Sequence, residues 1–232
     1  VIQTRILQLV ALGLCNSLIP VKSNGRLEYF GESVEETCYI RHLSANGIVS
    51  IIEKTENSVR LALSRSFVET GGTSTTELQT ARFTNVSESV VSENYSPDKY
   101  ILLDFDLLKV YEFTPSLKRM SVICRQKASH EIDAHSTYAI NNLRPFLITK
   151  GSHVVMSQLM NSIPIVKDGN SIDQSYTLSI PDLITKNLAD KRCFVFAFKP
   201  FLTLPNIKTE TQQSLEKGST FLGISVIEDE LA

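Results

Sequence analysis

The sequence has 232 residues, of which 42% are hydrophobic and 21% charged, so its composition is that of a folded globular chain and not of a disordered one. Its 23 Lys and Arg residues are balanced by 25 Asp and Glu residues. A basic excess would be needed to neutralise a nucleic-acid backbone or an anionic membrane surface, so this balance argues against a polyanionic partner. A core of this size needs neither disulfides nor a structural metal.

The chain contains four cysteines, Cys15, Cys38, Cys124 and Cys193. They are far apart, form no CxxC pair and have no His at zinc-ligand spacing, which favours a reduced, cytosolic setting. Two Asn-x-Ser triplets, at 85–87 and 94–96, would suit a secreted chain, but such triplets often arise by chance.

The first apolar segment, residues 5–15, imitates a signal peptide that ends at a lipoprotein-type cysteine. Polar Gln3, Gln8 and Asn16 interrupt the apolar run around this segment, and Pro20 ends it short of the roughly 20 residues that a membrane span requires. We therefore expect a buried helix.

The next elements are a helix and a β-hairpin. Ser33 to Glu36 form a capping box, in which the Ser33 hydroxyl accepts from the Glu36 amide and the Glu36 side chain reaches back. Gly47 is expected to close this helix. Segments 48–54 and 58–64 are rich in Ile, Val and Leu and predict a hairpin, which is followed by a loop at 70–76.

Residues 100–113 and 119–126 predict two antiparallel strands joined by a turn at 114–116. After a polar stretch, residues 146–150 predict a strand, Gly151 a turn, and Ser152 the cap of a helix that ends at Met160. This order of elements places Lys150 at a sheet edge.

The remaining segments predict a loop at 169–177, a helix from Pro181 through Leu188, and strands at 193–198 and 221–227. Strands separated by helices at irregular intervals, with several hairpins, predict an α+β fold with a mainly antiparallel twisted β-sheet flanked by helices.

The residues alone indicate no catalytic or metal site. His130 and His135 are five residues apart, which separates them by about 140° on a helix and places them on opposite faces of a strand. No GxxxxGK[ST], GxGxxG or GxSxG motif occurs.

Residues 112–123, with the sequence EFTPSLKRMSVI, give a more specific indication. This segment resembles the nucleotide-binding domain of P-type ATPases, and most closely that of the type IV phospholipid flippases. Further landmarks of that domain follow in the family's order: ALGLCN at 11–16, SVEE at 33–36, KG at 150–151, an arginine segment at 192–199 and LGISVIED at 222–229.

The resemblance implies a role for three residues in binding ATP. Phe113 would stack its ring on adenine, although a core position would also explain an aromatic residue. Lys150 would line the adenine pocket or approach the phosphates, with a surface lysine as the alternative. Arg192 would hold the phosphate tail through its guanidinium fork, or else be solvated.

Three further residues would complete the ATP-binding set. Glu36 matches the family's acidic residue near the adenine, in addition to its role in the capping box. Lys118 would add positive potential beside the pocket. Asp229 matches an acidic motif residue of the adjoining phosphorylation domain.

The resemblance thus predicts a nucleotide-binding domain at 1–220 and, at 221–232, a return strand into an absent phosphorylation domain. Such a chain would be the cytoplasmic domain of an integral membrane protein and would present ATP to an aspartate elsewhere in the parent chain, which drives phospholipid translocation. Its partners would be the phosphorylation and transmembrane domains and an accessory subunit, with Mg²⁺ held mainly outside these residues. The isolated chain should bind ATP weakly, because an open pocket on one domain has no second wall to offset the ligand's lost freedom. It should not hydrolyse ATP, because it contains no phosphorylatable DKTGT motif.

Two other interpretations stay open. The domain could be a degenerate regulatory or scaffolding domain that keeps the fold without binding nucleotide productively. It could also belong to a P-type subclass that moves cations or polyamines, which differs mainly outside these residues.

Overall fold

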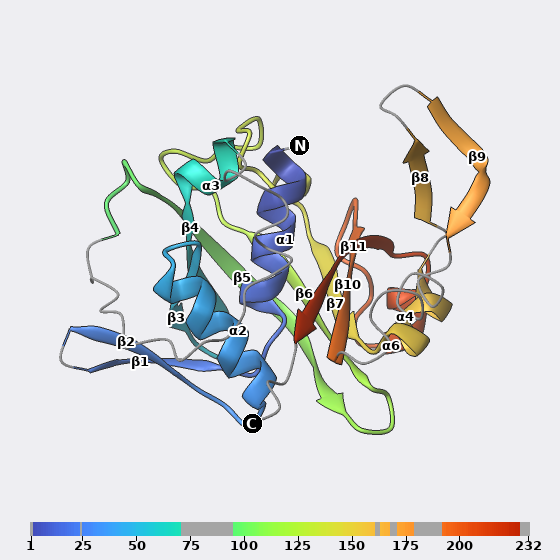
Figure 1. Ribbon diagram of the computed structural model, residues 1–232, viewed down its shortest axis with the longest axis horizontal. Helices are drawn as coiled ribbons and strands as arrows, with labels where there is room; N and C mark the ends of the chain where they lie inside the picture. Colours follow the sequence, from blue (N-terminus) through green and yellow to red (C-terminus); the bar gives the residue numbers. More distant parts are fainter. Residues whose placement is uncertain are drawn as a thin grey trace.

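The computed structural model describes residues 2–23, 25–70, 95–160, 163–167, 171–178 and 192–227 (Figure 1). Its helices are α1 (Ile2–Leu14), α2 (Val34–Ala45), α3 (Arg65–Thr70), α4 (His153–Leu159) and α6 (Gln212–Glu216), with one 3-10 turn, η1 (Asn141–Leu143). Its strands are β1 (Ile19–Ser23), β2 (Arg26–Phe30), β3 (Val49–Lys54), β4 (Ser58–Ser64), β5 (Tyr100–Thr114), β6 (Arg119–Gln126), β7 (Phe146–Gly151), β8 (Ile163–Lys167), β9 (Ser171–Leu178), β10 (Arg192–Pro200) and β11 (Thr220–Ile227).

A seven-stranded antiparallel sheet forms the centre of the fold. Its spatial order is β11-β10-β7-β6-β5-β4-β3, so successive strands of the sheet follow the chain order. The hairpins β1-β2 and β8-β9 form two separate two-stranded sheets. The fold is therefore α+β with a mainly antiparallel sheet, as the sequence predicts.

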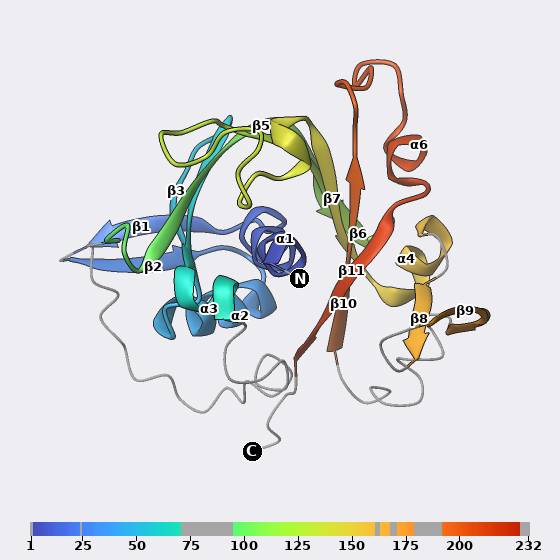
Figure 2. The same ribbon diagram turned by 90° about the horizontal axis from the view of Figure 1, so that it is seen from above.

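The sheet curls around α1, which lies against its concave face with α2 and α3 beside it (Figure 2). The 13 residues of α1 bury Ile6, Leu9, Val10 and Leu14 against the inward side chains of the sheet. This apolar stripe confirms the expected buried helix, since its residues recur at helical spacing. None of the described helices is long and apolar enough to cross a membrane.

The convex face of the sheet carries two smaller apolar clusters. Met156 and Leu159 of α4 pack against Val195 and Ala197 of β10. Leu215 of α6 packs against β6 and β7. Side chains alternate between the two faces along each strand, so neighbouring residues of β6, β7 and β10 face different clusters.

Most strands lie where the sequence predicts them. The 48–54 and 58–64 segments pair as β3-β4, and 100–113 and 119–126 pair as β5-β6, both antiparallel. β5 extends through Thr114, so the turn between β5 and β6 lies at 115–118 and not at 114–116. The last two predicted strands pair as β10-β11.

Some local predictions were wrong. Lys150 is not at a sheet edge, because β7 lies between β6 and β10 and the residue is buried. Ser152 is the N-cap of α4, but its side chain makes no capping hydrogen bond. Residues 171–177 belong to β9 and not to a loop.

Several other predictions lie outside the described residues. They are the loop residues 71–76, the Asn-x-Ser triplet at 85–87, Asn94 of the triplet at 94–96, and the helix at 181–188.

Candidate functional site

The sheet register brings the described candidate residues to one end of the sheet. Met120 of β6 pairs with Lys150 of β7, and Lys150 pairs with Phe196 of β10. Phe113 lies in the bulged end of β5 opposite Met120, one strand farther away. Since neighbouring strands are about 4.8 Å apart, the backbones of β5 and β7 are separated by about 10 Å.

Arg192 begins β10 three residues before Val195, which pairs with Gly151 at the end of β7. Arg192 therefore lies about 10 Å beyond the end of β7, at the same end of the sheet as the last residues of β5 and β7. Lys118, in the β5-β6 turn, belongs to this end as well. Phe113, Lys118, Lys150 and Arg192 thus share one end of the sheet.

Lys150 and Glu36 form an ion pair at this end of the sheet. Their side chains are 2% and 7% exposed. The Lys150 ammonium also lies 5.2 Å from the centre of the Phe194 ring, close enough for a cation–π interaction. The Lys150 side chain is therefore held in a defined position between a carboxylate and an aromatic ring.

The second carboxylate oxygen of Glu36 accepts hydrogen bonds from the backbone N–H and the hydroxyl of Ser17, both at 2.8 Å.

The predicted capping box of α2 forms only in part. Ser33 caps α2, with its Oγ accepting from the Glu36 N–H at 3.2 Å. The Glu36 side chain, however, contacts Ser17 and Lys150 and does not reach back, because a buried cation and two donors satisfy it better than one amide.

A second cation, Lys54 of β3, joins this cluster and was not predicted from the sequence. Its ammonium donates to the backbone oxygen of Asn16 at 2.7 Å and to its side-chain oxygen at 3.3 Å. Burial lowers the pKa of Lys54, against the opposing effect of the Glu36 carboxylate. Asn16 in turn donates to the Leu12 and Gly13 carbonyls and so caps the C-terminus of α1.

Two buried groups lie next to the Glu36–Lys150 pair. Burial raises the pKa of the Cys15 thiol to about 12. The Tyr39 hydroxyl, one turn after Glu36 in α2, is buried without a hydrogen-bond partner. A donor of this kind costs about 1–3 kcal/mol when unsatisfied, so an acceptor atom brought by a ligand or water would be stabilised there.

Arg192 forms an ion pair with Glu35, at 2.6 Å between Nη1 and Oε1. The Arg192 side chain is 61% exposed, so this contact leaves it accessible. A hydrogen bond from the backbone amide of Glu35 itself, assisted by Arg192, lowers the pKa of the Glu35 carboxyl. Two cations from β7 and β10 therefore reach consecutive carboxylates in the first turn of α2.

Phe113 is half exposed, and Lys118 is exposed with a positive φ of 51° at the end of its turn. Phe113 is therefore not part of the core, and its ring is accessible to a planar ligand. Asp229 lies outside the described residues.

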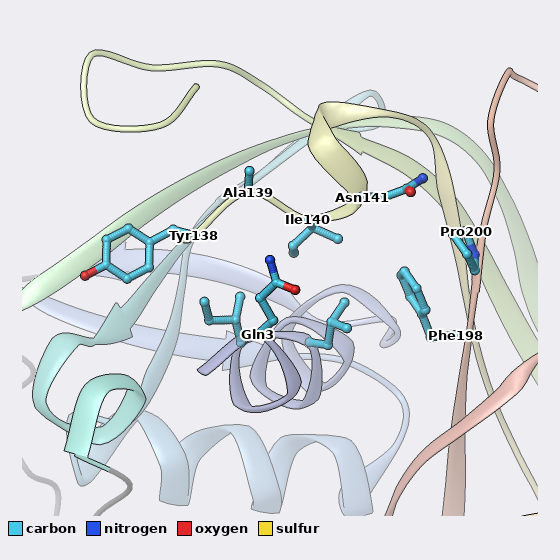
Figure 3. A pocket seen from close by; sticks show the side chains of 9 residues that line it. Gln3, Tyr138, Ala139, Ile140, Asn141, Phe198 and Pro200 are labelled. Carbon is cyan, nitrogen blue, oxygen red and sulfur yellow. The ribbon is translucent and has the colours of Figure 1, made fainter. Parts of the chain in front are cut away.

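A cavity of about 230 Å³ lies elsewhere, at the other end of α1 (Figure 3). It is lined by Gln3, Ile6, Leu7, Tyr138, Ala139, Ile140, Asn141, Phe198 and Pro200. Since α1 is about 20 Å long, this cavity is well separated from Ser17 and the Glu36–Lys150 pair. Its lining is mostly apolar, and none of the candidate residues contributes to it.

Within the described ranges, no group of three or more His, Cys, Asp or Glu side chains is placed to hold a metal ion. No protein-family model matches the chain, and no curated protein matches it.

Proposed function

We propose that the chain is the ATP-binding domain of a flippase-like P-type ATPase, which presents ATP to a phosphorylatable aspartate on a separate domain and so drives phospholipid translocation. The observation that carries this proposal is the position of Phe113, a half-exposed aromatic ring at the same end of the sheet as Lys150 and Arg192. An aromatic ring at the same end of a sheet as two cations suits a purine that carries phosphates.

Each residue has a distinct task in this proposal. Phe113 stacks on the adenine, and the exposed Arg192 guanidinium exchanges Glu35 for a phosphate oxygen. Lys150 and Glu36 form the polar wall of the adenine pocket. Lys118 adds positive potential at the rim, and Mg²⁺ enters with the nucleotide and is held mainly by the phosphorylation domain.

A titration of the chain with ATP, followed by isothermal calorimetry, tests the proposal. Phe113→Ala and Arg192→Ala change exposed side chains, so their folding should be nearly unaffected while ATP affinity falls at least several-fold. Leu202→Ala is the matched control, because Leu202 is 79% exposed but follows β10 at the opposite end of the sheet. Equal affinity in all four proteins would refute the site.

A second candidate function is a scaffolding domain that keeps the fold without binding nucleotide productively. The buried Glu36–Lys150 pair favours it, since the Lys150 charge is already neutralised within the chain. The same titration separates the two candidates: no heat of binding at millimolar ATP supports the scaffold.

A further inference from the structure

A buried charged cluster lies on the convex face of the sheet, away from α1 and α2. The Glu216 side chain, at the end of α6, is fully buried, and the Arg119 side chain is 9% exposed. Arg119 Nε donates to Glu216 Oε2 at 2.6 Å. This pair joins two segments that are 97 residues apart in the sequence.

The other oxygen of the Glu216 carboxylate is also satisfied. It accepts from the Ser121 hydroxyl and, at 2.7 Å, from the Gln212 side-chain amide. The Ser121 hydroxyl is also 2.9 Å from that of Thr149 on β7. A buried ion pair whose remaining hydrogen-bonding sites are filled fixes the geometry of the groups around it.

Arg119 connects this buried ion pair to the turn between β5 and β6. It is the first residue of β6, and its Nη1 donates back to the Leu117 carbonyl at 3.3 Å. The Lys118 carbonyl accepts from the Ser152 N–H at 3.0 Å. Gly151 lies so close that an added Cβ would be 2.7 Å from the Arg119 Cβ. The turn is thus attached to both α6 and the β7-α4 junction.

Phe113 lies on the other arm of this hairpin, in the bulge between the Tyr111–Ser121 and Thr114–Arg119 pairs. A bulge lacks regular ladder hydrogen bonds, so the ring's direction depends on how the neighbouring strand is held. On that strand Met120, opposite Phe113, is buried in the core, and the adjacent residue Arg119 is fixed by its pair with Glu216.

We propose that Glu216 is a positioning residue for the proposed nucleotide site: through Arg119 it holds the end of the β5-β6 hairpin and so orients the Phe113 ring. The link between Glu216 and nucleotide binding rests on the proposed function. The effect of Glu216 on the orientation of the side chain at position 113 can be measured without nucleotide. Glu216 lies on the face of the sheet opposite α2 and does not touch the ligand in this arrangement.

The chain contains no Trp, so Phe113→Trp introduces a single fluorescent reporter at this position. We expect Glu216→Gln in this background to lower the anisotropy of the introduced indole and to raise its acrylamide-quenching constant, both without ligand. The side chain at position 113 is already half exposed, so full exposure could raise the quenching constant by no more than about twofold. Arg119→Gln should have the same effect, and the double variant should add little to either.

Two further variants separate positioning from general destabilisation and from misfolding. Ser121→Ala removes one hydrogen bond to the Glu216 carboxylate but leaves its ion pair with Arg119, so it should raise the quenching constant by a smaller factor. Ile51→Val weakens the core on the other half of the sheet and should leave the quenching of the reporter unchanged. Unchanged quenching in both Glu216→Gln and Ser121→Ala, or an equal rise in Ile51→Val, would overturn the inference.

An ATP titration of the Phe113→Trp chain, read by the fluorescence of the introduced indole, addresses the proposed function separately. If ATP leaves this fluorescence unchanged, the nucleotide assignment fails while the quenching comparison still decides the positioning role. If ATP binds, Glu216→Gln should weaken its affinity several-fold, and equal affinity would overturn the role of Glu216 in that site.

Discussion

Lys150 and Glu36 are 114 residues apart in the sequence and form a buried ion pair between β7 and the first turn of α2. The pair joins β7, an inner strand of the sheet, to α2, which lies beside α1 on the concave side. Both side chains are almost completely removed from water, so each is the main compensation for the other's charge.

Removing both partners of this pair should therefore cost much less than the sum of the two single removals. Lys150→Met leaves the Glu36 carboxylate buried, and we expect it to lower the free energy of unfolding by about 3–5 kcal/mol. The double variant Lys150→Met, Glu36→Leu should lose clearly less than the sum of the two single variants. Urea denaturation of the four proteins measures this coupling, and additive losses would contradict it.

Cys15 should be resistant to alkylation. Its thiol is fully buried and donates to the Met120 and Ile148 carbonyls, and burial raises its pKa to about 12. At pH 8 only about one thiol in 10⁴ is then ionised, and the thiolate is the reactive form. Iodoacetamide followed by mass spectrometry should modify the half-buried Cys38 much faster than Cys15.

Unfolding the protein in denaturant should remove this difference between the two thiols. Rapid modification of Cys15 in the folded protein would show that its surroundings open readily.

Stability should decline at alkaline pH because of Tyr29. The hydroxyl of Tyr29 donates to Ser44 Oγ and accepts from the Ile51 N–H, and burial raises the pKa of Tyr29 to about 12. Between pH 10 and 12 the unfolded chain loses the Tyr29 proton while the folded chain keeps it. The free energy of unfolding should then fall by about 1.4 kcal/mol per pH unit, having been unaffected by this group below pH 10.

Tyr29→Phe is the control for this pH effect. It should be less stable than the original chain at pH 7, because the Ile51 N–H and Ser44 lose a partner, but its decline between pH 10 and 12 should be shallower. Parallel curves for the two proteins would assign the alkaline effect to other groups.

Gly151 should not tolerate a side chain. An added Cβ would be 2.7 Å from the Arg119 Cβ and 3.0 Å from the Lys118 carbonyl oxygen, so we expect Gly151→Ala to cost about 1–3 kcal/mol. Gly223→Ala is the matched strand control, since its nearest neighbour would be the flexible end of Gln8 at 3.6 Å. Thermal unfolding should show a clear decrease in Tm for the first variant alone.

The strands were predictable because their signals are local. Apolar runs separated by short turns predict β3 to β6, and Gly47, with a φ of +66°, ends α2 as expected. The β9 strand was missed because its segment is polar, and polar segments are typical of loops.

The candidate site was less predictable, because its contacts join distant parts of the chain. The sequence indicates Glu36 and Lys150 as separate candidates, but no sequence pattern indicates that they are partners. Nothing in the sequence indicates that Lys54 and Ser17 belong to this cluster, since a lysine at a strand end and a serine after a helix are usually solvated. The Asn16 cap could have been recognised from its place directly after an apolar helical segment.

The packing of α1 has a consequence for how this chain acquires its structure. Gln8 donates to the Leu222 carbonyl across 214 positions of sequence, and the helix packs against both early and late strands. This apolar helix is synthesised before every strand that it contacts. It cannot make its contacts with β11 until nearly all of the other strands have been synthesised. Such non-local closure slows folding and leaves the apolar face of the helix exposed in the meantime.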